Sequence, residues 1–134
     1  MNSFKGNISH INTKGNLSII TIQINDKIKL KSIVVETPKT ASFLHINNEI
    51  AVLFKETEVI ISIDQNSKSS VQNSILGTIK SIEKGALLSK VNLATSAGDL
   101  TTIISTDAIT DLNLKIDLKV TALIKLNEIM LSNT

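Results

Sequence analysis

The side chains of this sequence that could do chemistry are mainly hydrogen-bond donors, and few of them are spaced for catalysis. All 14 basic residues are Lys, and the absence of Cys leaves no thiolate for nucleophilic attack or metal binding. His10 and His45 are isolated and lack the spaced partners of a zinc site. Asp107 and Asp111 lie one helical turn apart, which fits a solvated helix face better than acid–base catalysis. No nucleophile elbow or phosphate-cradling loop occurs either, so the sequence predicts a binding protein rather than an enzyme.

An internal repeat places some of these donors twice. Residues 33–62 align with residues 103–132 at a constant offset of 70, without a gap, so that Lys55 matches Lys125. Residues 4–8 match residues 75–79 at an offset of 71. Self-similarity at a fixed spacing indicates a tandem duplication. We therefore predict two modules, residues 1–63 and 71–134, joined by a polar, Ser-rich linker over residues 64–70.

Each module is predicted to be built from strands. Runs rich in β-branched residues, alternating in part with a period of two, are typical of strands. In the first half the predicted strands are residues 4–11, 17–24, 27–35, 50–55 and 59–63, with a tight turn at Asn25-Asp26. One short helix is expected between the third and fourth strands of each half. The order favours an all-β chain of two tandem five-stranded OB-like Greek-key barrels, with a plain β-sandwich as the alternative.

The expected helices have recognisable starts. Thr37 can cap a helix over residues 39–44, and Pro38 fits its first position, where no amide donor is needed. In the second half Thr106 or Asp107 can cap a helix over residues 108–112. The repeat therefore predicts one helix in each module.

Composition limits the partners. No run of about 18 apolar residues occurs, and residues 1–10 lack the pattern of a signal peptide, so we expect a cytoplasmic protein without a membrane partner. Arg, Tyr and Trp are absent and the net charge is only +2. OB folds that bind single strands use aromatic platforms and basic grooves, so a nucleic-acid partner is not expected.

The second half carries the motifs of a known family. Residues 73–86, NSILGTIKSIEKGA, resemble the opening of a Mop domain, and residues 120–131, VTALIKLNEIML, resemble its ending. The likeness covers residues 70–134 well and reaches residues 1–63 more loosely, through the internal repeat. The chain thus resembles the two-repeat molybdate-binding proteins (di-Mop molbindins) of the Mop/TOBE-domain family.

The resemblance implies that three two-module chains form a homotrimer of OB-like modules. It implies that molybdate or tungstate binds as an oxyanion at interfaces between modules, with no organic cofactor and no bare metal ion. In the family the donors come from a segment ahead of the first strand, from hydroxyls after the third strand, and from the Lys that ends the fourth strand with the next backbone amide.

The family's donor positions fall mainly on the second half of this sequence. Lys84 beside Gly85 is an added candidate, although such residues are most often part of a turn. The predicted oxyanion-binding residues are Ser70, Val71, Gln72, Asn73, Ser105, Lys125, Leu126, Lys55, Asn2 and Lys84. Each has a plainer interpretation as well, because the lysines could simply end strands, the residues of the 70–73 segment could be linker, and Ser105 could cap the short helix.

The sequence departs from the family pattern in three ways. Gln72 stands where the family has Arg, and Val35 stands in the first half where the second half has Ser105. A second family hydroxyl falls on Ala108 and on Pro38, so both halves lack it. We therefore expect a weakened site, and a weaker one in the first half than in the second.

These observations leave two functions in contention. The first is a cytoplasmic binding protein for molybdate or tungstate, used in storage or homeostasis. The second is a regulatory or assembly module of the same fold whose anion binding has been weakened or lost. Both predict the homotrimer, because one small module cannot hold a large core alone.

Overall fold

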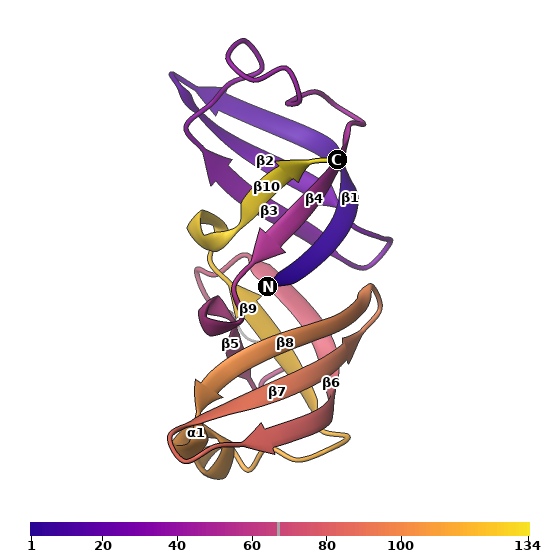
Figure 1. The fold of residues 1–134 in the computed structure, drawn as a ribbon. Coiled ribbons are helices and arrows are strands. Elements are labelled where there is room, and N and C mark those ends of the chain that lie inside the picture. Colours follow the sequence, from indigo (N-terminus) through magenta and orange to yellow (C-terminus); the bar gives the residue numbers. More distant parts are fainter. Residues whose placement is uncertain (67) are drawn as a thin grey trace.

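The computed structural model describes residues 1–66 and 68–134 and consists of two five-stranded antiparallel sheets stacked end to end (Figure 1). The first half contributes β1 (Asn2–Lys14), β2 (Leu17–Gln23), β3 (Lys29–Val34), β4 (Glu49–Phe54), the 3₁₀ turn η1 (Glu56–Glu58) and β5 (Ile60–Ser62). The second half contributes β6 (Asn73–Lys84), β7 (Leu88–Thr95), β8 (Gly98–Ser105), α1 (Thr106–Asp111), β9 (Lys119–Ile124), η2 (Leu126–Glu128) and β10 (Met130–Asn133). The repeated order of strands and the all-β fold class are confirmed.

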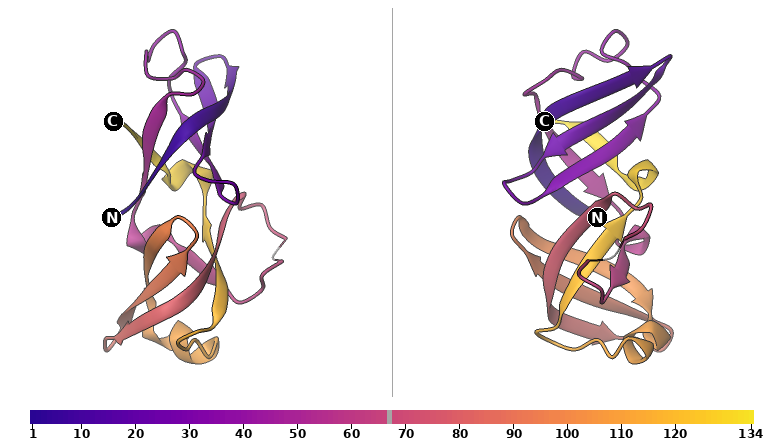
Figure 2. Two further views of the ribbon diagram at one scale, coloured as in Figure 1. Left: turned by 90° about the vertical axis from the view of Figure 1, so that its right-hand side faces the viewer. Right: turned by 180° about the vertical axis from the view of Figure 1, so that it is seen from behind.

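The long first strand of each half organises its sheet. β1 pairs with β4 through residues 2–7 and with β2 through residues 7–14, and the register shifts between Ile8 and His10. β6 repeats this arrangement, with its shift between Ile79 and Ser81. Such a bulge bends the strand, so that its first part can pair with one neighbouring strand and its last part with another. The strands therefore curl as an OB-like barrel requires (Figure 2).

A glycine permits the curl in the first half. A Cβ atom built on Gly6 would lie 2.5 Å from the carbonyl oxygen of Gln23 and 2.8 Å from Cγ2 of Ile22. Only a residue without a side chain lets β1 pass so close to β2. Gly77 occupies the same place on β6, where the nearest contact of an added Cβ would be 3.2 Å, to Cβ of Leu93.

The last strand of each half belongs to the sheet of the other half. β5 pairs with β9, with Ile60 opposite Leu123, and β10 pairs with β4, with Met130 opposite Leu53. The sheet orders are therefore β10-β4-β1-β2-β3 and β5-β9-β6-β7-β8. Figure 1 shows the yellow β10 lying beside β4 in the upper sheet. The division of the sequence at residues 64–70 stays a prediction, and Ser67 of that linker lies outside the described residues.

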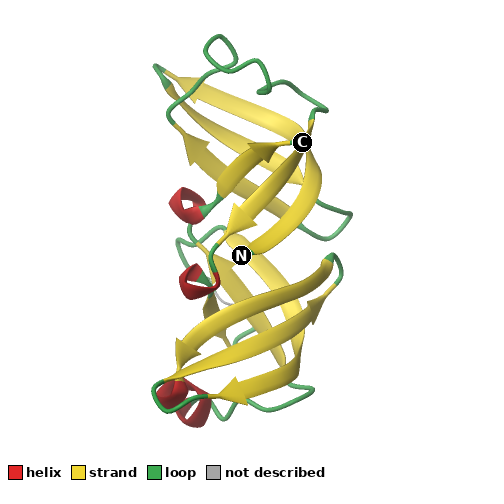
Figure 3. Ribbon diagram, viewed as in Figure 1, coloured by secondary structure: helices red, strands yellow, loops and turns green. Residues whose placement is uncertain are grey.

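The helix expected over residues 39–44 is wrong, because this segment is a series of turns (Figure 3). The amides of Thr40 and Ala41 both donate to the carbonyl of Thr37, and the amide of Leu44 then donates only to Ala41. The Thr40 hydroxyl accepts from the amide of Thr37, a side-chain bond that competes with a helical ladder. In the second half α1 does form, because Ser105 Oγ accepts from the amide of Ala108 at 3.2 Å. The first half has Val35 and Pro38 at these two positions, and neither can make that bond.

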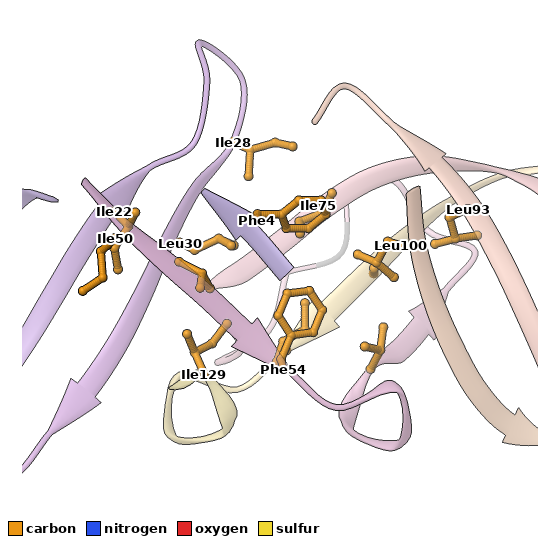
Figure 4. Close-up of a cluster of buried hydrophobic side chains, with 14 of the residues drawn as sticks. Phe4, Ile22, Ile28, Leu30, Ile50, Phe54, Ile75, Leu93, Leu100 and Ile129 are labelled. Atoms are coloured by element: carbon orange, nitrogen blue, oxygen red, sulfur yellow. The ribbon is translucent and has the colours of Figure 1, made fainter. Parts of the chain in front are cut away.

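One continuous core joins the two halves. Phe4 and Phe54 meet with ring centroids 6.0 Å apart, and Ile129, which leads into the exchanged strand β10, is 3% exposed. Figure 4 shows Ile129 beside Phe54 and Leu30 of the first half. The exchange therefore buries second-half side chains in the first-half sheet, and neither half has a complete core of its own.

Candidate functional site

The strand-ending lysines lie where the two sheets meet. Lys125 follows β9 and precedes η2, and Lys55 follows β4 and precedes η1. Both are exposed and both have extended backbone, with φ −65° for Lys125 and −75° for Lys55. Figure 1 shows both 3₁₀ turns near the junction of the sheets. The two lysines thus occupy matching places in the two halves, as the repeat predicts.

Three other predicted residues lie close to Lys125 along the chain or across the sheet. Asn73 of β6 pairs in register with Ile124 of β9, so Gln72 and Lys125 are the next residues along the same two chain segments. We call Gln72, Asn73, Lys125 and Leu126 the second-half donor group. Ser70 and Val71 lead into it, with Ser70 exposed and Val71 partly buried. The group offers amide N–H and ammonium donors without a carboxylate among its own side chains.

The asparagine of this group is already engaged. Its Oδ1 accepts from the amide of Lys31 at 2.7 Å, and its Nδ2 donates to the Lys31 carbonyl at 2.9 Å. Asn73 is 1% exposed, so these bonds are shielded from water. In the first half Asn2 makes the same pair of bonds to Thr101, both at 2.8 Å. Both asparagines therefore tie the first strand of one half to the third strand of the other, and Asn73 has one N–H left to donate.

Buried hydroxyls make a second pair of ties. Ser32 of β3 donates to the carbonyl of Ile129 at 2.7 Å, and Thr102 of β8 donates to the carbonyl of Val59 at 2.9 Å. Ser32 and Thr102 are both 0% exposed. The donors and acceptors are again related by the offset of 70. These two hydrogen bonds were not predicted from the sequence. The signal that could have revealed them is a hydroxyl residue that recurs, at the same place in both halves, among the inward-facing positions of a strand.

A loss of stability tests the asparagine ties. We expect Asn73→Ala to cost about 1–3 kcal/mol, because it leaves two shielded backbone groups of Lys31 without partners. Asn66→Ala, in the exposed linker, should change the free energy of unfolding by less than about 0.5 kcal/mol. Urea unfolding at one fixed protein concentration compares the two variants. Equal midpoints would show that the Asn73 tie carries no stability.

The remaining predicted residues lie at the other end of the second-half sheet. Ser105 ends β8 opposite Leu88 and caps α1, as the plainer interpretation held, and Lys84 ends β6 opposite Ser89. β6 runs from Asn73 to Lys84, on the order of 35 Å of strand at about 3.3 Å per residue. One tetrahedral oxyanion cannot reach both ends. A site that used both the second-half donor group and Ser105 would therefore need a neighbouring chain.

The first half differs at its matching strand end. Glu56 stands at the position of Leu126, and its Oε2 lies 2.9 Å from the amino group of Met1. Hydrogen bonds from that amino group and from its own backbone amide hold the pKa of the Glu56 carboxyl below its usual range. The first-half group of Met1, Asn2, Lys55 and Glu56 therefore contains a charged acceptor. The signal in the sequence is that Lys55-Glu56 aligns with Lys125-Leu126 in the repeat.

A groove beside the second-half sheet includes neither Lys125 nor Lys55 among the described residues of its lining. It has a volume of about 540 Å³ and lies between the β2–β3 turn, the linker and the outer face of the second-half sheet. Its lining includes Lys27, Lys119, Thr78 and Thr95, and none of the ten predicted residues is among the described residues that line it. The groove is therefore not the predicted site.

Metal binding was the other chemistry considered for the two histidines. His10 and His45 are both exposed, and residues 1–66 and 68–134 contain no cluster of three His, Cys, Asp or Glu side chains that could hold a metal ion. No helix within these ranges has the length and apolar character needed to cross a membrane.

Comparisons with known protein families and solved structures show which proteins this chain is similar to. The TOBE domain model matches residues 69–131. A crystal structure of the cytoplasmic molybdate-binding protein ModG, with molybdate bound, matches with a TM-score of 0.91 and 27% identity, over 99% of this chain and 96% of that one. A search of curated protein sequences finds no match.

Two shorter proteins match part of the chain. MopII from Clostridium pasteurianum is 29% identical over 43% of this chain and 88% of its own, with a TM-score of 0.42. A molybdate-binding protein from Sporomusa ovata is 36% identical over 44% of this chain and 88% of its own, with a TM-score of 0.43. Together with the two sheets and the repeated motifs, these matches show that the chain belongs to the Mop/TOBE domain family.

Proposed function

We propose that this protein binds molybdate or tungstate in the cytoplasm and serves storage or homeostasis of the anion. The observation that carries the proposal is the second-half donor group, set in a fold that superposes over nearly its whole length on a molybdate-bound relative. Molybdate is a tetrahedral dianion with acceptor oxygens only, so it needs donors and cations and no catalytic base.

The strength of such a site follows from its donors. Each hydrogen bond to a charged group contributes roughly 1.5–3 kcal/mol, so five or six contribute about 8–18 kcal/mol before the costs of association. Micromolar binding needs only about 8 kcal/mol net. A site with Gln72 in place of an Arg can still reach that range, because it keeps the Lys125 ammonium. A weak site also suits a store that must release its anion.

We propose that each site is completed by a second chain in a homotrimer. The argument is the separation of the second-half donor group from Ser105 and Lys84 at the opposite end of β6. Exposed apolar side chains near Ser105, with Leu87 82% and Leu88 60% exposed, give the neighbouring chain a surface to cover. Sedimentation at micromolar concentration should give three times the mass of the 14.5 kDa chain, and a monomer would contradict the shared site.

Calorimetric titration with molybdate, tungstate and sulfate tests the proposed function. We expect heat at micromolar molybdate or tungstate and weaker binding of sulfate, which is a smaller dianion. No heat at millimolar concentration of any of the three would contradict the proposal.

The alternative is a regulatory or assembly module that has lost tight anion binding. The observation in its favour is that Asn73 and Asn2 already use their side chains to tie the two halves together. An intact homotrimer that gives no heat with any of these anions would establish this alternative.

A further inference from the structure

The two strand ends of this chain differ in the residue that follows the strand-ending lysine. Lys55 is followed by Glu56, and the matching Lys125 is followed by Leu126. The resemblance assigns the backbone amide of this following residue to the anion. In the first half that residue brings a carboxylate of its own.

The Glu56 carboxylate already engages a donor at the first-half strand end. Its Oε2 accepts from the amino group of Met1 at 2.9 Å, and this bond is the main cause that holds the pKa of the carboxyl below its usual value. The Lys90 ammonium lies near enough to favour the charged carboxylate further. A carboxylate and an oxyanion are both acceptor-only, negatively charged groups, so they compete for the same donors.

The second half has no such occupant. Leu126 is apolar, and its 3₁₀ turn η2 contacts β3, where the Asn73 side chain bonds to the backbone of Lys31. The matching partner of the first-half end is Thr101 of β8, which carries no charge. At the second-half end no side chain at the matching position competes with an added dianion, whereas at the first-half end the Glu56 carboxylate already accepts from the Met1 amino group.

We propose that Glu56 occupies the first-half anion position from within the chain, so that each chain binds one oxyanion, at the second-half donor group. This inference rests on the proposed function. It makes Glu56 the residue that sets the number of anions bound, beyond the absence of a hydroxyl at Val35.

A reciprocal exchange of the two residues tests the inference. Equilibrium dialysis against molybdate should give one anion per chain for the unchanged protein. Glu56→Leu should add a second, weaker molybdate per chain, and Leu126→Glu should weaken binding by at least about tenfold. Glu56 makes a partly exposed ion pair, with side-chain exposure of 29%, so its loss should leave the fold intact. Circular dichroism and sedimentation of each variant check this.

A matched control uses the other acidic residue of the same turn. Glu58 is present in both halves, as Glu58 and Glu128, so it does not distinguish them. Glu58→Gln should therefore leave the count of bound molybdate unchanged. If Glu58→Gln adds an anion as well, general charge and not the place of Glu56 sets the number, and the inference is overturned.

The outcomes separate this inference from the proposed function. Binding by the unchanged protein with the same count in Glu56→Leu overturns the inference alone, as does a count of two anions per chain before any change. Binding by Glu56→Leu but not by the unchanged protein contradicts the proposed function and also overturns the count of one anion per chain. No binding by either protein overturns both.

Discussion

Removing residues 129–134 is expected to unfold the protein under conditions in which the full chain is stable. The deletion takes away Ile129, which is 3% exposed, and the strand β10 that covers the edge of β4. Loss of a buried Ile side chain costs about 2–5 kcal/mol, and the Ser32 hydroxyl left without its acceptor costs about 1–3 kcal/mol more. The total approaches the whole stability of an ordinary domain.

Thermal unfolding followed by circular dichroism measures this effect at a fixed protein concentration, since assembly makes the midpoint depend on concentration. A shorter deletion, of Asn133 and Thr134 only, keeps Ile129 and most of β10 and should cost less than about 1 kcal/mol. If both deletions unfold at the same temperature, the exchanged strand is not what holds the first-half sheet together.

Lys125→Ala is expected to weaken molybdate binding by about tenfold to 150-fold, the equivalent of one lost charged hydrogen bond of roughly 1.5–3 kcal/mol. Lys55→Ala should change it by less than about threefold, because the first-half end already contains the Glu56 carboxylate. The dissociation constants come from calorimetric titration.

The control for this pair is Lys115→Ala, an exposed lysine of the loop before β9, which removes the same charge from the chain. It should leave the dissociation constant unchanged. An equal effect of Lys55→Ala and Lys125→Ala would contradict the difference between the halves. An equal effect of all three variants would show that only net charge matters.

The sequence predicted most of the fold because its signals are local. Runs of β-branched residues and the repeat predicted the strands. The caps expected at Thr106 or Asp107 are wrong, because both residues lie inside α1 and Ser105 is its N-cap. The first-half helix failed because Val35 and Pro38 remove the capping acceptor and its donor, a detail that the helix pattern alone does not weigh. Of the site residues predicted in the second half, the structure places Asn73 and Lys125 at one end of β6 and Lys84 and Ser105 at the other.

The exchange of strands could not have been predicted from pattern. Residues 60–62 and 130–132 match at the offset of 70, so each strand carries side chains that suit either sheet. Hydrophobic phase fixes which face of a strand is buried and says nothing about which of two similar sheets receives it. The choice depends on the path of η1 and η2 across the seam, where the ties to Val59 and Ile129 lie.

The exchange also changes what substitution can do to this protein. A one-module chain that paired with its own copy in this manner would be self-complementary, so every substitution would occur on both sides of the seam. Fusion of two modules removes that constraint, and one side can alter while its counterpart is preserved. Glu56 and Leu126 show such divergence across a common interface. Covalent joining thus allows the two halves of a duplicated chain to acquire different residues at their matching strand ends. The two halves together remain the unit that folds.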